Sequence, residues 1–209
     1  YRACVSYADA QVGKIMAELK KLGLDKNTVV VLLGDHGWSL GDHNQWCKHS
    51  NFNIVNNAPL IIKVPGNQKK GAEPKVVEFV DVYPTLCEAV GLPVPHHTEG
   101  ESMMKLMTGE DKSWKDCAII KWHSGVTYFD RDYGYTQWND KAGNFQGHML
   151  FLYRNDHLET KNVADAPENK EIVAQLQKEI LARRGKDFMK QVPKADKPER
   201  KGTQAHKRK

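Results

Sequence analysis

The sequence predicts an α/β fold in which helices cover a sheet, followed by a smaller region of antiparallel strands and one helix. Residues 28–33, TVVVLL, form an unbroken β-branched and aliphatic run, typical of a strand covered on both faces. Residues 59–64, PLIIKV, form a second such run. After residue 114 the sequence pattern changes to short, aromatic-rich runs bounded by turn residues, which are typical of antiparallel strands. A layered α/β part and a small α+β part are therefore expected.

The first element is predicted to be a helix. Its apolar residues fall three or four positions apart, at Val5, Ala8, Val12, Ile15, Met16, Leu19 and Leu22. This spacing places them on one face of a helix and predicts one buried stripe. The segment GLDKN then ends the pattern, and the first strand follows.

The first strand leads directly into residues 34–51, GDHGWSLGDHNQWCKHSN. This stretch contains three histidines, two aspartates, two tryptophans, one cysteine and one lysine. In folds with parallel strands, loops at the carboxyl ends of the strands carry the chemistry. The stretch is therefore the main candidate for a functional site.

Further elements follow in order. Residues 80–93, VDVYPTLCEAVGLP, predict a short helix. Four strands are predicted at CAIIKW, GVTYFD, YGYTQWND and HMLFLYRN. A helix is predicted over 165–185, with Asp165 and Glu168 at capping-box spacing. We divide the chain into residues 1–113, the C-terminal part of a larger α/β core; 114–186, a small α+β subdomain; and 187–209, a basic and disordered tail.

The bulk composition is that of an ordinary globular protein. The chain has 209 residues, of which 40% are hydrophobic and 27% charged, with a net charge of +5. No run of about 18 apolar residues exists, so no membrane span is predicted. The basic tail could contact nucleic acid, but its lack of apolar residues favours a solvated terminus, and no nucleic-acid partner is expected. The start, YRACVSYADAQ, has neither an initiator Met nor a signal, so we expect a piece of a longer protein.

Three residues of the polar stretch suggest specific chemistry. Asp35 and His36 come directly off a strand end, where a fixed backbone and free side chains suit metal ligands. Alternatively, Asp35 caps the loop and His36 bonds to a neighbour. Lys48 lies between Trp46 and Phe52, and a partly enclosed ammonium would suit a tetrahedral anion.

The stretch DHGWSLGDHNQWCKHSNFNIVNNAPLII resembles the second signature region of the sulfatases, in the alkaline-phosphatase-like superfamily, and within them the iduronate-2-sulfatase group. The first 24 residues, VEFVDVYPTLCEAVGLPVP and the segment from YGYTQWND to NVAD resemble further regions of that group. The resemblance covers residues 1 to about 185. It implies the C-terminal part of a sulfatase core, with a mixed, mostly parallel sheet, and the sulfatase C-terminal subdomain.

The resemblance implies roles for five residues. Asp35 and His36 match two ligands of the catalytic divalent metal, which is calcium in this family, and Lys48 matches the lysine that contacts the substrate sulfate. Trp38 and His49 would line the substrate pocket. Because calcium prefers oxygen ligands and His36 offers nitrogen, the residues by themselves leave zinc, manganese and magnesium open.

The sulfatase nucleophile is a formylglycine made within a C/S-x-P/A-x-R motif, and none of the four cysteines begins one. We therefore expect the formylglycine and the remaining metal ligands upstream of this chain, and no turnover by this chain alone. The implied partners are a sulfated carbohydrate, such as a sulfated sugar or uronate, and the N-terminal part of the same protein. The implied location is secreted, periplasmic or lysosomal. The rivals are a phosphodiesterase or phosphonate hydrolase of the same superfamily and a non-catalytic fragment.

Overall fold

The first part of the chain is built around a two-stranded ribbon. The structure is a computed structural model that describes residues 1–110 and 113–190. After helix α1 (Arg2–Lys21) and the 3-10 turn η1 (Leu24–Lys26), strand β1 (Val30–Leu33) pairs antiparallel with β4 (Leu60–Lys63). The residues predicted as buried strands are therefore strands. They pair with each other antiparallel, whereas the whole core was expected to be mostly parallel.

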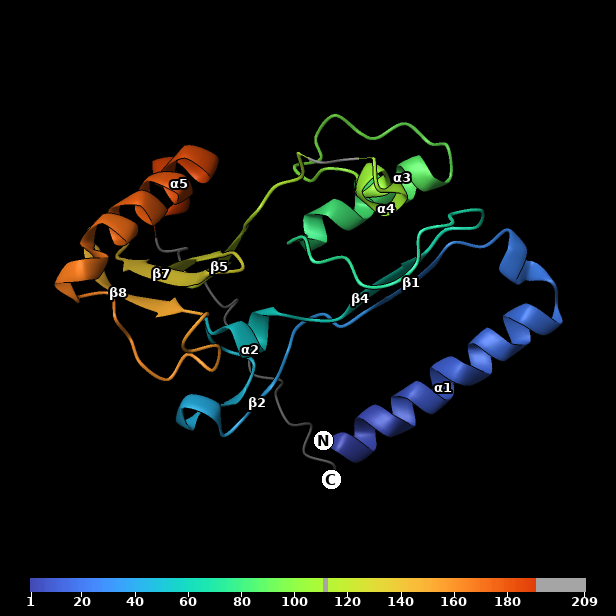
Figure 1. The fold of residues 1–209 in the computed structure, drawn as a ribbon, viewed down its shortest axis with the longest axis horizontal. Coiled ribbons are helices and arrows are strands. Elements are labelled where there is room, and N and C mark those ends of the chain that lie inside the picture. Colours follow the sequence, from blue (N-terminus) through green and yellow to red (C-terminus); the bar gives the residue numbers. More distant parts are fainter. Residues whose placement is uncertain (111–112, 191–209) are drawn as a thin grey trace, which may run out of the picture.

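Helices lie on both sides of this ribbon (Figure 1). On one side, the 3-10 turn η3 (Phe79–Asp81) continues into α3 (Val82–Ala89), and α4 (Met104–Thr108) follows. A small core forms there, in which Met103, Leu106 and Trp114 pack with side chains of β4 such as Leu60 and Ile62. On the other side α1 runs past the ribbon (Figure 1). The fold class, a layered α/β arrangement, is as predicted.

The apolar stripe of α1 was predicted to be buried, but within the described part of the chain it is not. No residue of α1 is buried, and Val5 and Ile15 are 53% and 67% exposed. The ribbon strands are also half open, because Leu33 and Ile61 are 44% and 60% exposed. The apolar pattern thus predicted the elements correctly, while the burial expected of them does not occur within this chain.

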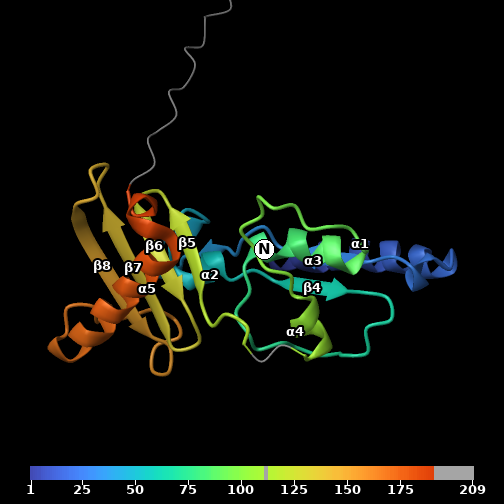
Figure 2. The same cartoon turned by 90° about the horizontal axis from the view of Figure 1, so that it is seen from above.

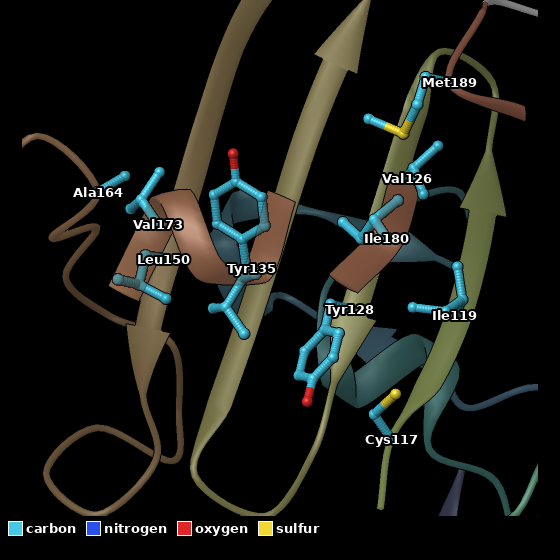
Figure 3. Close-up of a cluster of buried hydrophobic side chains, with 11 residues drawn as sticks. Cys117, Ile119, Val126, Tyr128, Tyr135, Leu150, Ala164, Val173, Ile180 and Met189 are labelled. Atoms are coloured by element: carbon cyan, nitrogen blue, oxygen red, sulfur yellow. The ribbon is translucent and has the colours of Figure 1, made fainter. Parts of the chain in front are cut away.

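The second part is the predicted antiparallel sheet. Its four strands, β5 (Ala118–Trp122), β6 (Gly125–Phe129), β7 (Tyr133–Asn139) and β8 (Phe145–Leu152), pair in sequence order. Helix α5 (Lys170–Phe188), entered through the 3-10 turn η4 (Pro167–Asn169), covers one face. Its buried side chains meet those of the strands in the main core, which includes Val126, Tyr135, Leu150 and Ile180 (Figure 3). The opposite face carries α2 (Asn53–Asn56), as Figures 1 and 2 show together.

The start of the last helix differs from the prediction. Asp165 and Glu168 do not form a capping box, because the 3-10 turn begins after Ala166 without a side-chain cap. The Asp165 carboxylate instead accepts a hydrogen bond from His148 Nε2 at 3.0 Å. A tertiary partner on β8 has therefore replaced the local one.

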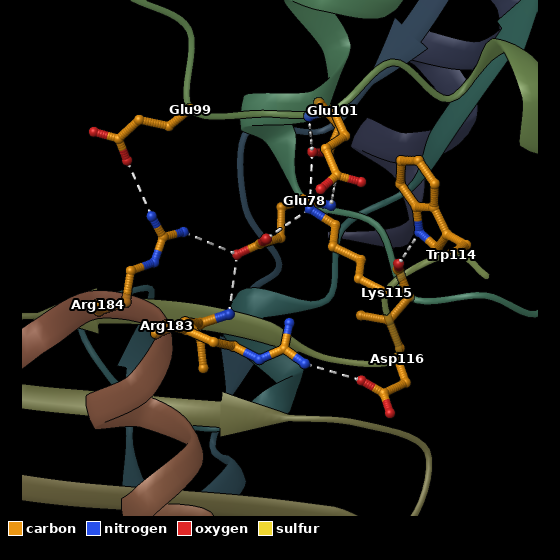
Figure 4. A network of polar contacts seen from close by, with 11 residues as sticks. Glu78, Glu99, Glu101, Trp114, Lys115, Asp116, Arg183 and Arg184 are labelled. Atoms are coloured by element: carbon orange, nitrogen blue, oxygen red, sulfur yellow. Dashed lines mark hydrogen bonds and ion pairs between the residues drawn. The ribbon is translucent and has the colours of Figure 1, made fainter.

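A buried ion network joins the two parts (Figure 4). The Lys115 ammonium lies 2.7 Å from both the Glu78 and the Asp81 carboxylates, and Asp81 is fully buried. From α5, Arg184 contacts Glu78 at 3.5 Å and Glu99 at 3.0 Å. Burial by itself lowers the pKa of Lys115, but its hydrogen bonds with Asp81 and Glu78 outweigh burial and raise it.

Residues near two of the predicted domain boundaries are buried. Trp114, the first residue of the predicted second part, packs in the small core with Met103 and Leu106. Helix α5 is broken at Gly185, which has φ 71° and ψ 172°, and a further helical turn follows through Phe188; Met189 is 5% exposed in the main core. The rest of the predicted tail, residues 191–209, lies outside the described residues. In the described ranges, 1–110 and 113–190, no helix is both long enough and apolar enough to cross a membrane.

Candidate functional site

The site begins where β1 ends. The backbone N–H of Gly34 donates to the Pro59 carbonyl at 3.0 Å, which extends the ribbon by one step. Gly37 then donates its N–H to the Val55 carbonyl at 2.6 Å. A Cβ atom at Gly37 would overlap the Ile54 carbonyl oxygen, so only glycine permits this approach. Between these two anchors the chain exposes the side chains of Asp35 and His36.

A short hairpin brings Lys48 back to the same place. Strand β2 (Ser39–Leu40) pairs antiparallel with β3 (Trp46–Cys47), across the 3-10 turn η2 (Asp42–Asn44). The turn is tight, and His43 and Asn44 both have positive φ values, of 53° and 55°. The His43 ring lies flat on the Phe52 ring, with 3.7 Å between centroids and 5° between planes. The hairpin therefore folds over the segment that follows it.

Three predicted residues converge. Lys48 Nζ lies 2.6 Å from His36 Nε2 and 4.0 Å from Asp35 Oδ2. Asp35 Oδ2 lies 3.1 Å from His36 Nε2. The side chains of Asp35 and Lys48 are 78% and 41% exposed, and that of His36 is 23% exposed. Asp35 and His36, which follow β1, and Lys48, which follows β3, thus form one cluster at the surface.

The chemistry of the cluster fits a cation. His36 Nδ1 lies 2.7 Å from the Gly37 carbonyl oxygen, which can only accept, so Nδ1 carries the proton. In the neutral ring, Nε2 then has one lone pair, which can accept from the Lys48 ammonium at 2.6 Å, and the Asp35 carboxylate lies beside it. Two electron-pair donors at 3.1 Å need a positive charge between or beside them, and the Lys48 ammonium supplies one. Asp35 and His36 fit as two ligands of a divalent metal. Within residues 1–110 and 113–190, no group of three or more metal-binding side chains forms.

The two remaining predicted residues lie apart from each other. The Trp38 ring stacks on the His36 ring at 5.9 Å between centroids, and the Tyr1 ring also stacks on Trp38 at 6.5 Å. Trp38 therefore borders the cluster. His49 turns the other way and stacks on Trp122 of β5 at 5.2 Å. His49 joins the hairpin to the sheet rather than reaching Asp35 and His36.

A cavity of about 580 Å³ opens beside Asp35 and His36. It lies between the two parts of the chain, and its lining also includes Phe79 of η3, Tyr153 and Arg184 of α5. Lys48, Trp38 and His49 are absent from the lining. Asp35 and His36 therefore border this cavity, whereas Lys48 does not line it.

Two buried polar residues without a predicted role hold this region. Asn51, 4% exposed, donates from Nδ2 to Thr127 Oγ1 at 2.9 Å. Glu159, 3% exposed, accepts from the Asn53 N–H at 2.8 Å. Burial raises the pKa of Glu159, although its hydrogen bonds with the Asn53 N–H and the Tyr153 hydroxyl oppose this. Asn51 stood in the polar stretch, but no local pattern marked Glu159, because its partner is 106 residues away in sequence.

Comparisons with known proteins agree on one family. Residues 1–92 match the family described as Sulfatase. The iduronate 2-sulfatase of Mus musculus is 36% identical over 120 residues, which cover 46% of this chain and 22% of that protein. The Delta 4,5-hexuronate-2-O-sulfatase of Bacteroides thetaiotaomicron is 30% identical over 178 residues, which cover 79% of this chain and 36% of that protein. The chain thus spans well under half the length of these relatives.

Solved structures show the same architecture. A 2-O GAG sulfatase superposes with a TM-score of 0.65 at 29% identity, over 76% of this chain and 37% of that one. A phosphonate monoester hydrolase from Silicibacter pomeroyi superposes with a TM-score of 0.77 at 24% identity, over 86% of this chain and 39% of that one. At this identity the second match reports the fold alone.

Proposed function

The chain belongs to the sulfatase family, and on that premise we propose that it forms part of an enzyme that hydrolyses sulfate esters of a sugar or uronate. The observation that carries the proposal is the convergence of Asp35, His36 and Lys48. The relatives named for 2-sulfated uronates support a sulfated carbohydrate as the substrate class.

In this proposal Asp35 and His36 would hold a divalent metal, for which we propose Ca²⁺. Bound there, the metal would stabilise negative charge on the sulfate oxygens. A metal would take the Nε2 lone pair that now faces Lys48 Nζ at 2.6 Å, so the ammonium would turn from His36 toward a sulfate beside the metal. Lys48 binds the sulfate as a point charge and stabilises the charge that develops when the ester bond breaks.

Trp38 and His49 are proposed to shape the pocket around the sulfate. The indole of Trp38, stacked on His36, limits access of water to the donor pair. His49, stacked on Trp122, fixes the backbone directly after Lys48. Neither side chain is assigned a proton transfer.

The nucleophile is proposed to be a formylglycine upstream of this chain. The residues after Cys4, Cys47, Cys87 and Cys117 do not complete the required motif. Cys117 is buried besides, and burial raises its pKa to about 11, which disfavours a thiolate. We therefore expect no turnover from these 209 residues alone. A secreted, periplasmic or lysosomal location follows from the same proposal.

The alternative function is phosphonate or phosphodiester hydrolysis on the shared fold. The sequence W-x-K-x-S-N around Lys48 favours the sulfatase reaction, because it resembles that family's anion-binding segment. A direct comparison of substrates separates the two functions.

The test uses these residues within the longer polypeptide that we propose, produced with its formylglycine. We expect release of sulfate from a 2-O-sulfated hexuronate disaccharide and from an aryl sulfate, and much slower hydrolysis of a phosphonate monoester. Asp35→Ala and Lys48→Ala should each lower kcat/KM about 10²–10³-fold. The matched controls, Asp9→Ala on α1 and Lys70→Ala, change exposed side chains and should leave the rate unchanged. Removal of metal by a chelator should abolish activity, and Ca²⁺ should restore it. Less than a tenfold loss in both Asp35→Ala and Lys48→Ala would refute the assigned roles.

A further inference from the structure

The segment between the hairpin and β4 rests on the C-terminal sheet through two buried polar contacts. The first is made by Asn51. Its Nδ2 donates to Thr127 Oγ1 at 2.9 Å and more weakly to the Gly125 carbonyl at 3.4 Å. Thr127 in turn shares a hydrogen bond of 2.9 Å with Thr136 on the neighbouring strand. The Asn51, Thr127 and Thr136 side chains are all nearly inaccessible.

The sheet is shaped to receive Asn51. A Cβ atom at Gly125 of β6 would lie 2.7 Å from Asn51 Oδ1, closer than a real Cβ contact. Glycine at this position therefore lets the amide reach the strand. A strand glycine that leaves room for a close neighbour is a recognised use of the residue.

The second contact is made by Glu159, in the loop after β8. Its Oε2 accepts the Asn53 N–H at 2.8 Å, at the first residue of α2. Its Oε1 accepts the Tyr153 hydroxyl at 2.9 Å, which fixes the carboxylate. Glu159 has a positive φ of 58°, an uncommon backbone state for glutamate. Such states persist where the surrounding structure holds them.

Both halves of the catalytic cluster are connected to this segment. Lys48 precedes Asn51 by three residues, so the Asn51 contact fixes the base of its loop. The other end of α2 accepts, at the Val55 carbonyl, the N–H of Gly37, which directly follows His36. The C-terminal sheet therefore holds the segment that relates Lys48 to Asp35 and His36.

We propose that Asn51 and Glu159 are positioning residues, which act through segment 51–55 to hold Lys48 opposite Asp35 and His36. Neither side chain touches the three clustered groups, so neither takes part in the reaction itself. The inference rests on the proposed function for its catalytic consequence, whereas the structural part stands alone. Displacement of a charged group by about 1 Å can cost about 10²-fold in rate.

The structural part is tested on the 209-residue chain by amide hydrogen exchange. Glu159→Ala and Asn51→Ala should increase exchange in residues 46–55 at least tenfold. Glu159→Gln, which retains an acceptor for the Asn53 N–H, should restore protection. The control is Val173→Ala, which removes core volume from α5 on the opposite face of the sheet and should not expose 46–55 selectively. Should an alanine variant fail to fold, the isosteric Thr127→Val removes the Asn51 acceptor with less disturbance and should loosen 46–55 in the same way.

The catalytic part is tested in the active polypeptide with an aryl sulfate. Glu159→Ala and Asn51→Ala should lower kcat about 10²-fold with a smaller change in KM, and Glu159→Gln should recover most of it. If the wild-type polypeptide releases no sulfate, the proposed function fails, independently of the exchange result. If Lys48→Ala is inactive while folded Glu159→Ala and Asn51→Ala keep wild-type kcat, the positioning role is wrong. Unchanged exchange of 46–55 in these variants, including Thr127→Val, would also overturn it.

Discussion

Gly37 donates its backbone N–H to the Val55 carbonyl at 2.6 Å, and this contact joins the residue after His36 to the end of α2. Because a Cβ atom at Gly37 would overlap the Ile54 carbonyl oxygen, the contact depends on the absence of a side chain. The backbone of the site is therefore fixed by close packing.

Gly37→Ala should destabilise the protein by about 1–3 kcal/mol, the usual cost of forcing extra volume into packed structure. The free energy of unfolding from urea titration measures it. Gly13→Ala in α1 is the matched control, because nothing lies within 4 Å of its added methyl group. It should be stabilising by up to about 1 kcal/mol, through helix propensity. Equal effects of the two substitutions would contradict the packing argument.

Lys115→Met should be strongly destabilising. The change leaves Asp81, which is fully buried, without its cation, and removal of one partner from a buried pair costs about 3–5 kcal/mol. Urea denaturation should show the loss at neutral pH. Lys178→Met, at an exposed position of α5, should stay within about 0.5 kcal/mol of the wild type. A small effect of Lys115→Met would mean that water reaches Asp81.

Glu159 should make stability depend on pH. Burial raises its pKa above the ordinary 4.5, with Asp156 adding to the shift and the Asn53 and Tyr153 hydrogen bonds opposing it. The folded state then binds the proton more tightly than the unfolded state. The stability contributed by this group is fully present below pH 4.5 and is lost as pH rises through the folded pKa.

Glu159→Gln cannot titrate, so its stability relative to the wild type should increase across that same window and then level off. Thermal unfolding at a series of pH values measures the difference. A difference that is flat with pH would show that the hydrogen bonds cancel the effect of burial, and one that falls as pH rises would show that they outweigh it.

The exposed apolar side chains of α1 and the ribbon should make the chain associate with itself. Ile15 and Ile61 are 67% and 60% exposed, and the outer edges of β1 and β4 pair with no other described strand. Sedimentation velocity should show larger species in the micromolar range. Substituting both isoleucines by lysine should shift the chain toward monomer.

Leu158→Lys is the control for this prediction, because Leu158 is 64% exposed but lies in the loop after β8. It should leave the association unchanged. A wild-type chain that sediments as a monomer and melts cooperatively would contradict the prediction.

The sequence predicted most elements because their signals are local. The period of α1, the β-branched run of β1 and the turn-bounded strands β5–β8 each lie within one short window. Burial was less predictable, because it depends on what packs against an element: Ile15 has the pattern of a core residue and is exposed. Asp165 failed as a cap for a similar reason, since His148, distant in sequence, binds it.

The candidate site was predictable in composition and only partly in geometry. The resemblance identified Asp35, His36 and Lys48, and the structure brings these three together. It could not show that His49 stacks on Trp122, because that contact depends on a residue 73 positions further along the chain. The contact between Glu159 and Asn53 could not be predicted either, because the two residues are 106 positions apart in the sequence.

That contact also sets an order of events during synthesis. Asn53 and Glu159 are separated by 106 residues, and a ribosome adds about 5–20 residues per second, so Asn53 waits roughly 5–20 s for its partner. During this time the loop with Lys48 has left the ribosome without the sheet that anchors it. The loop with Lys48 is thus among the last parts of the nascent chain to settle, and a stall in translation before residue 159 would leave it without its contact to Glu159.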